Sequence, residues 1–309
     1  MLRLLQQVIF GATLIGGLFV VCFAELLARP CSFVSLSRRQ MFVKRQLSRA
    51  FAWTVTVCFW IRVKTTARSK PAFTAARLEL AEGRSLGFLV THASYLDAIL
   101  IYKLFPGDFV ARSKTIASGA LRKLPLLGAI CEGCGHIFLG YRASKDPASF
   151  GLEEASREKV RLVVEDHMHK NDGHSNGVLF MAPEGMVNPN PSVLMPFRTG
   201  GMRIALDNDI ELWAAVFVGN EVSWPKLAAI GGYPGDIALD FQPIFSDSAF
   251  YKARAILARA QKEVAAGTRK AVASTHNDDH DAALLAEVCR ERMQQLYDDL
   301  STDMKVLFN

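Results

Sequence analysis

The sequence predicts an α/β domain with a largely parallel sheet flanked by helices, preceded by an N-terminal apolar helical pair in or on the membrane. From residue 85 onward, strand-like apolar runs alternate with stretches of helical apolar spacing. This alternation is typical of a parallel sheet layered with helices. The membrane part is predicted because residues 4–23 carry no charge. With 309 residues and 50% apolar content, the chain can bury one large core or two small ones.

Two apolar runs open the chain. Residues 4–23 are long enough to cross a hydrocarbon core of about 30 Å as a helix. A cleaved signal peptide is the alternative, but its apolar region usually spans about 7–15 residues after a basic start, whereas here the basic flank mostly follows. The second run, 50–61, is too short for an easy crossing and contains two Trp. It predicts a re-entrant or interfacial helix, with a buried helix of the main domain as the alternative.

Positive charge is concentrated beside these runs. Ten basic residues and no acidic residue lie between Arg29 and Lys70, while the remainder of the chain is slightly acidic. Such basic flanks favour the cytoplasmic side of a membrane and its anionic lipids. A nucleic-acid-binding surface across the main domain is not expected. We therefore predict a membrane anchor with a basic interfacial segment at 1–70 and the main domain, with its C-terminal helices, at 71–309.

The elements of the main domain can be predicted in chain order. Strands are expected at 86–90, 108–112, 136–140, 177–182, 210–219 and 236–244. Helices are expected at 95–105, 117–130, 153–169, 199–207, 247–266 and 281–300. In a parallel sheet the functional loops gather at the C-terminal ends of the strands. Polar residues just past those ends are therefore the candidates for a site.

His92 and Asp97 follow the first strand of this domain, in the stretch THASYLDAIL. On a continuous helix, positions five apart point roughly 140° apart, so the side chains meet only if the chain turns between them. A histidine that is oriented by a carboxylate can act as a general base. The alternative is structural, because Ser94-x-x-Asp97 matches a capping box at a helix start. The two interpretations are compatible.

Further charged residues follow the later strands. Arg142 comes just past the third strand, Glu184 and Gly185 come just past the fourth, and Arg198 precedes a helix start. Arginines at neighbouring strand ends suit an anionic substrate such as a phosphate. No serine stands in a G-x-S-x-G elbow, so a covalent hydrolase nucleophile is not indicated. The CEGC stretch at 131–134 lacks a partner at zinc-finger spacing, so no metal is expected.

At this point the chain resembles the membrane glycerolipid acyltransferases, the family of lysophosphatidic acid and lysophosphatidylcholine acyltransferases. The blocks that carry the resemblance occur in order: HASYLD with H-x-x-x-x-D spacing, LPLLG, GHIFLGYR, APEG, FRTGG and the β segment LWAAVFVG. They span about residues 85 to 220. The resemblance implies that 71–309 is a glycerolipid acyltransferase domain, which moves an acyl group from acyl-CoA to a lysophospholipid hydroxyl in glycerophospholipid synthesis or remodelling.

The resemblance also implies roles. His92 would be the general base that deprotonates the acceptor hydroxyl, and Asp97 would orient it. Four residues would shape the site of the acceptor phosphate: Arg142, Glu184, Gly185 and Arg198. The implied partners are membrane lipids, a lysophospholipid and acyl-CoA as co-substrate, with no further cofactor. The implied location is the endoplasmic reticulum membrane with the catalytic domain in the cytosol, or the inner membrane of a bacterium.

Several positions depart from the family pattern. Met186 and Val187 replace the threonine and the frequent arginine that follow proline-glutamate-glycine, so one expected phosphate contact is missing. Thr91 replaces an asparagine, and Tyr95 replaces a tryptophan. None of these changes removes the histidine and the aspartate. The loop with asparagines at 188 and 190 slightly favours lysophosphatidylcholine as the acceptor.

Two other functional classes stay open. One is a membrane-bound, thioesterase-like hydrolase that uses water as the acceptor. The other is a catalytically inactive membrane scaffold, against which the retention of His92 and Asp97 argues. Consumption of acyl-CoA without a lysophospholipid would distinguish the hydrolase.

Overall fold

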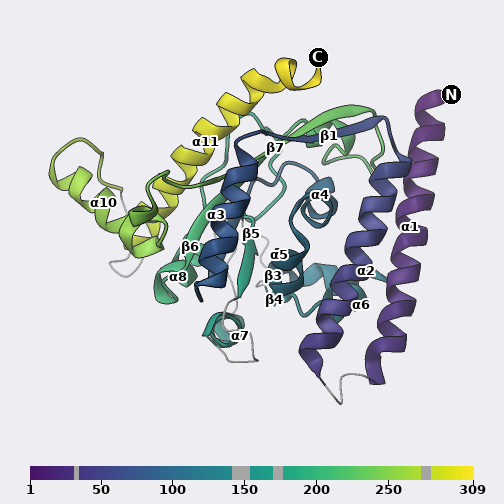
Figure 1. Ribbon diagram of the computed structural model, residues 1–309, viewed down its shortest axis with the longest axis horizontal. Helices are drawn as coiled ribbons and strands as arrows, with labels where there is room; N and C mark the ends of the chain where they lie inside the picture. The colour runs from purple at the N-terminus through teal and green to yellow at the C-terminus, as the bar shows by residue number, and fades with distance from the viewer. Residues whose placement is uncertain (31–34, 141–153, 170–176, 273–279) are drawn as a thin grey trace. The chain divides into compact units, whose positions relative to one another are not determined.

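The computed structural model describes residues 1–30, 35–140, 154–169, 177–272 and 280–309 (Figure 1). The chain divides into two compact units. The first unit comprises Met1–Ile9, Cys58–Ala98 and Met181–Asn309, and the second comprises Phe10–Val57 and Ile99–Phe180. The division predicted at residue 70 stays a prediction.

The predicted fold class is confirmed. In the first unit, four strands lie in the order β1 (Ile61–Thr65), β7 (Gly235–Pro243), β6 (Glu211–Val218) and β2 (Leu86–Val90). In the second unit the order is β5 (Val178–Met181), β3 (Ser113–Ser118) and β4 (Ile137–Leu139). The β6–β7 pair is antiparallel, and the pairs β1–β7, β2–β6, β3–β5 and β3–β4 are parallel.

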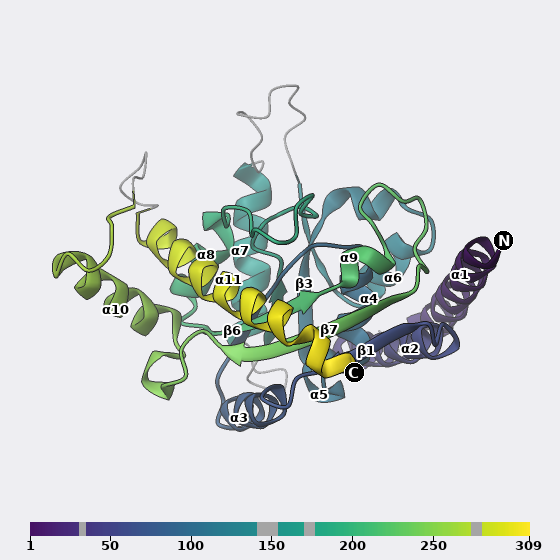
Figure 2. The same cartoon turned by 90° about the horizontal axis from the view of Figure 1, so that it is seen from above.

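Helices cover both faces of the first unit's sheet. They are α3 (Ser69–Ala81), α8 (Thr199–Asp207), α9 (Asn220–Ser223), α10 (Ala253–Ala265) and α11 (His280–Phe308). In Figure 2, α3 lies on one side of β6 and β7, and α11 runs along the other. Strand β6 is buried at every position for this reason. At the core, Phe241 stacks between Phe73, at 4.3 Å, and Trp213, at 5.5 Å between ring centroids.

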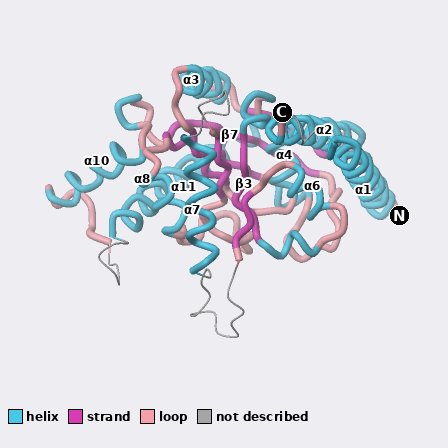
Figure 3. Tube along the Cα trace, turned by 90° about the horizontal axis from the view of Figure 1, so that it is seen from below, coloured by secondary structure: helices cyan, strands magenta, loops and turns pink. Residues whose placement is uncertain are grey.

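The second unit contains α2 (Leu36–Val57) and, from Phe10 onward, α1 (Leu2–Ala28), and these two helices lie side by side (Figures 1 and 3). The buried residues of α1 recur at helical spacing and include Phe10, Leu14, Gly17 and Val21. A Cβ on Gly17 would lie 3.2 Å from the Cβ of Ala50, so the small residue permits close packing of the two helices. The opposite face of α1 exposes large apolar side chains, among them Phe19, Val20, Phe23 and Leu27. By length and composition, α1 could cross a membrane.

The remaining helices in the described part of the chain are short, apart from α7. They are α4 (Leu96–Leu104), α5 (Gly107–Arg112), the 3-10 turn Gly119–Lys123, α6 (Leu127–Gly133) and α7 (Glu154–His169), with a second 3-10 turn at Ser248–Phe250. The strand predicted at 108–112 is wrong, because α5 occupies it and β3 begins only at Ser113. Pro106 stands at the N-cap of this helix and Asp108 lies in its first turn, which favours a helix start. A short apolar run does not by itself distinguish a strand from a buried helix.

Three other segments differ from the prediction. The run 50–61 is not a separate helix: it forms the end of α2, followed by the turn into β1. The helix predicted at 117–130 is interrupted at Pro125 and Leu126, the latter with φ +63°. Strand β1 and helix α3 were not predicted. The alternation of apolar and basic residues in β1 is typical of a strand with one exposed face.

Candidate active site

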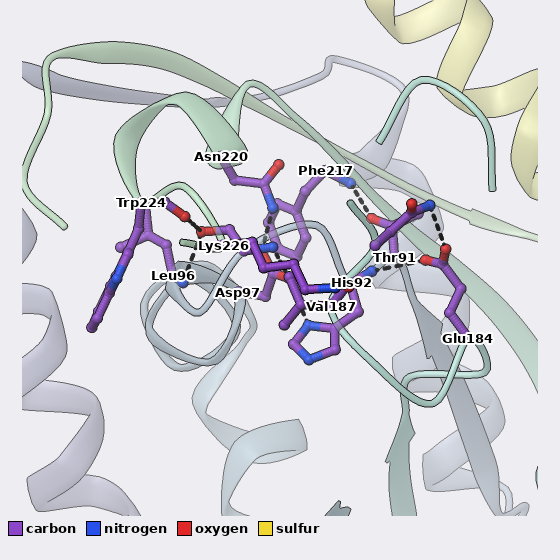
Figure 4. Close-up of polar contacts among 12 residues, drawn as sticks. Thr91, His92, Leu96, Asp97, Glu184, Val187, Phe217, Asn220, Trp224 and Lys226 are labelled. Atoms are coloured by element: carbon purple, nitrogen blue, oxygen red, sulfur yellow. Dashed lines mark hydrogen bonds and ion pairs between the residues drawn. The ribbon is translucent and has the colours of Figure 1, made fainter. Parts of the chain in front are cut away.

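His92 lies in the turn between β2 and α4, in the first unit. Its Nδ1 is 2.9 Å from Oδ2 of Asp97, so the two side chains meet as the sequence predicts (Figure 4). The histidine side chain is 29% exposed and that of Asp97 is 4% exposed. The pair therefore presents an accessible imidazole on a buried carboxylate. This arrangement can fix the imidazole with its proton on Nδ1 and leave Nε2 as the base.

The structural interpretation of Ser94 is also correct. Its Oγ accepts a hydrogen bond from the Leu96 N–H at 3.1 Å and donates one to the Trp224 carbonyl at 2.7 Å. Its backbone N–H donates to Oδ2 of Asp97 at 3.1 Å. The capping box thus forms, and the same Asp97 oxygen also meets His92. Capping holds the carboxylate rigidly beside the base.

Glu184 is a buried residue that stabilises the site through hydrogen bonds. It is 2% exposed, and its Oε1 accepts a hydrogen bond from the backbone N–H of His92 at 3.2 Å. Its Oε2 accepts from Nδ2 of Asn188 at 2.6 Å and from the Met195 N–H at 3.0 Å. Burial raises the pKa of Glu184, and these hydrogen bonds oppose that shift. The carboxylate therefore joins the loop after β5 to the loop that carries His92.

Gly185 and Arg198 lie against each other. Gly185 has φ +75°, and a Cβ there would lie 2.4 Å from Nε of Arg198, so glycine is required in this conformation and at this contact. The backbone N–H of Arg198 donates to the Pro183 carbonyl at 2.8 Å. Arg198 is exposed and stands directly before α8. Among the predicted substrate-binding residues, Arg142 lies outside the described residues.

The loop after Gly185 is closed by two contacts. The Asn188 N–H donates to the His92 carbonyl at 2.6 Å, and Nζ of Lys226 donates to the Val187 carbonyl at 2.8 Å. Val187 is buried, whereas Met186 is exposed. Asn188 is 2% exposed, and its side chain is bonded within the loop. Asn190 is exposed, and the preference for lysophosphatidylcholine that rested on this loop stays a prediction.

Known proteins resemble this chain over the region just described. Residues 88–218 match the family model described as Acyltransferase. The chain carries an acyltransferase-family domain. The family predicted from the sequence blocks is thus confirmed, and the matched stretch includes His92, Asp97, Glu184, Gly185 and Arg198.

A solved structure shares the fold of this acyltransferase chain. It is the crystal structure of the 1-acyl-sn-glycerophosphate (LPA) acyltransferase PlsC from Thermotoga maritima, with a TM-score of 0.57. The two chains are 17% identical, and the match covers 97% of this chain and 96% of that one. At this identity the likeness supports the fold. A comparison with curated proteins gives no match.

Two residues of the candidate site are not predicted from the sequence. Asn220 donates through Nδ2 to Oδ1 of Asp97, and Lys226 holds the loop at Val187. Asn220 lies two residues after the C-terminal end of β6. Functional residues gather at such strand ends, so this position could be identified from the sequence. Lys226 gave no signal, because it lies in a loop without a motif. Within the described ranges, no group of three or more metal-ligating side chains occurs.

Proposed function

We propose that this protein is a lysophospholipid O-acyltransferase that moves a fatty acyl group from acyl-CoA to the hydroxyl of lysophosphatidic acid or lysophosphatidylcholine. The observation that carries the proposal is the pair of His92 Nδ1 and Asp97 Oδ2 at 2.9 Å, with a partly exposed imidazole on a buried carboxylate. The acyltransferase-family match over residues 88–218 supports the same reaction class.

In the proposed reaction, Nε2 of His92 takes the proton of the acceptor hydroxyl. The resulting oxygen nucleophile attacks the thioester carbon of acyl-CoA, and the C–S bond breaks as the new C–O bond is completed. The imidazolium then returns its proton to the departing CoA thiolate, so the histidine ends the cycle neutral. Asp97 fixes the ring and stabilises the imidazolium while it exists. No covalent acyl-enzyme is required.

The acceptor phosphate would be bound by arginines. Arg198, held against Gly185 beside the site, is the described candidate, and Arg142 is the second one proposed from the sequence. A guanidinium can contact a phosphate in bidentate fashion. Acyl-CoA enters only as a co-substrate, and no resident cofactor is proposed.

We further propose that α1 anchors the protein in a membrane. The exposed apolar face of α1 supports this, since the side chains of Phe19, Phe23 and Leu27 are more than half exposed. The catalytic domain would face the cytosol, at the endoplasmic reticulum or, in a bacterium, at the inner membrane. Both substrates would then be reached from the same side.

The test is an acceptor panel with acyl-CoA labelled in the acyl chain. The purified protein is given lysophosphatidic acid, lysophosphatidylcholine or no acceptor, and labelled phospholipid and free fatty acid are both measured. Labelled phospholipid that depends on an acceptor supports the proposal. Fatty acid released equally without any acceptor would assign the protein to the hydrolases. The absence of product in every assay would instead favour a catalytically inactive membrane scaffold.

Two variants complete this test. His92→Ala should lower kcat about 10²–10⁴-fold, the usual contribution of a general base. Ser94→Ala is the structural control: loss of the cap costs about 0.5–2 kcal/mol of stability, while the chemistry persists. Activity near the wild-type level in folded His92→Ala would rule out the proposed base.

A further inference from the structure

Asn220 is brought to Asp97 by a sharp turn at the end of β6. Gly219 has φ +88°, and a Cβ there would lie 2.1 Å from the Asp236 carbonyl oxygen. Only glycine fits this conformation and this close approach. The turn makes Asn220 the first residue of α9, where it is completely buried. Figure 4 shows its amide pointing at the carboxylate of Asp97, on the side away from the His92 ring.

The two oxygens of Asp97 have different partners. Oδ2 meets Nδ1 of His92 and the backbone N–H of Ser94. Oδ1 accepts the hydrogen bond from Nδ2 of Asn220. The rotation of an aspartate carboxylate about its last torsion is broad and soft. The Ser94 N–H holds Oδ2 and the Asn220 amide holds Oδ1, so the two contacts together fix the rotation of the carboxylate relative to the imidazole.

Asn220 is not explained by its own hydrogen-bonding needs. Its Oδ1 is buried and accepts no hydrogen bond within the described part of the chain. A buried polar atom without a partner costs stability, and an apolar residue of the same shape would avoid that cost. Burying this amide therefore lowers the stability of the fold. Among the described hydrogen bonds, the one that its side chain makes is with Asp97.

We propose that Asn220 is a positioning residue for catalysis. By donating to Oδ1, it orients the Asp97 carboxylate and so keeps the proton of neutral His92 on Nδ1 and the base on Nε2. The inference rests on the proposed function for its catalytic consequence. Its structural consequence, the ring tautomer of His92, can be measured without any substrate.

The experiment compares Asn220→Leu, which keeps the approximate shape and removes the donor, with Ser223→Ala in the same helix. Ser223 is also completely buried, and its Oγ has no hydrogen-bond partner within the described residues, so its loss should leave the site unchanged. The full-length protein is labelled with ¹⁵N in its histidine rings. The His92 signals among the seven histidines are assigned by their loss in His92→Gln.

In the wild-type protein and in Ser223→Ala, neutral His92 should carry its proton on Nδ1. In Asn220→Leu the ring should become a mixture of both tautomers. With an acceptor and acyl-CoA, kcat should fall about 10–100-fold, less than the loss of the base itself, while both KM values stay within about twofold of the wild type. In the background of Asp97→Asn, Asn220→Leu should cause no further fall, because it acts through that carboxylate.

Other results would overturn the proposal. These are a wild-type tautomer and kcat in folded Asn220→Leu, or full additivity with Asp97→Asn. If Asn220→Leu does not fold, Asn220→Ser takes its place, since serine is small and too short to reach Asp97, and the same outcomes apply. An inactive wild-type protein would count against the proposed function alone, because the tautomer measurement would still decide the role of Asn220.

Discussion

The carboxylate of Glu184 accepts a hydrogen bond from the backbone N–H of His92 at 3.2 Å, although 92 positions separate the two residues. The second oxygen of the same carboxylate holds the Met195 N–H and the Asn188 side chain. Glu184 therefore acts on the main chain of the proposed base. Its exposure of only 2% leaves little surface for a substrate.

Glu184→Gln should destabilise the protein and lower kcat together. An amide nitrogen in place of Oε2 cannot accept the hydrogen bonds from Asn188 and Met195, and unpaired buried donors cost about 1–3 kcal/mol. The measurements are the free energy of unfolding and the kinetics of the same variant. Asn190→Ala, at an exposed position of the same loop, should stay within about 0.5 kcal/mol of the wild type. Unchanged stability with a raised KM for the acceptor would instead place Glu184 in direct contact with substrate.

Arg198→Lys should raise the apparent KM for the lysophospholipid more than that for acyl-CoA. An ammonium does not reproduce a bidentate guanidinium contact, and a charge-assisted hydrogen bond of about 1.5–3 kcal/mol corresponds to roughly 10–150-fold in acceptor kcat/KM. The same outcome is expected for Arg142→Lys.

The control for these arginines is Arg203→Lys, because Arg203 is exposed on α8 and pairs with Asp207 at 3.3 Å. It should leave both KM values unchanged. A variant of Arg198 or Arg142 with a lower melting temperature and equal effects on both substrates would show a structural role for that arginine.

The membrane anchor can be tested on the exposed face of α1 without disturbing its packing on α2. Ile15 and Phe19 are about half exposed, and a charge near the centre of a spanning helix costs about 2.5–3.5 kcal/mol. The double variant Ile15→Arg with Phe19→Arg should be released from membranes by high salt, which the wild-type protein should resist. Gly16→Ala, where the added methyl group meets no neighbour, is the apolar control. Release of the wild-type protein by salt alone would contradict a spanning helix.

The stability of the first unit should depend on pH through Glu211. Burial raises the pKa of Glu211 to about 7, although its ion pair with Arg84 at 3.1 Å opposes the shift. The folded state thus binds this proton more tightly than the unfolded state. The contribution of Glu211 to the free energy of unfolding is therefore complete below about pH 4.5, the ordinary pKa of a glutamate. This contribution is lost as the pH rises through about 7.

The free energy of unfolding should therefore fall by up to about 1.4 kcal/mol per pH unit within that window. Glu211→Gln should flatten this slope, as measured by chemical unfolding between pH 4 and 8. The control is Glu82→Gln, since Glu82 contacts the same Arg84 at 2.8 Å but is 61% exposed. A slope that persists in Glu211→Gln would assign the pH dependence to another group.

Local chemistry made the centre of the site predictable. His92 and Asp97 lie on the two sides of one turn, and the strand end, the cap at Ser94 and the helix start can all be read within ten residues. Strands β2, β5, β6 and β7 were also predictable, because apolar residues dominate each of these segments. At 108–112 only the three central residues are apolar, so the same evidence fits a helix, and neighbouring residues such as Pro106 favour the helix that forms.

The sequence by itself thus determined the fold class, the apolar N-terminal helix and the pair of His92 and Asp97, because each rests on interactions between residues close in the chain. Tertiary structure alone decided that Asn220 meets Asp97 across 123 positions. The parallel pairing of β2 with β6, with Val90 opposite Ala215, brings the ends of both strands to the same edge of the sheet. Such pairing depends on the burial of whole strands, with α11 packed on β6, which no local pattern around Asn220 encodes.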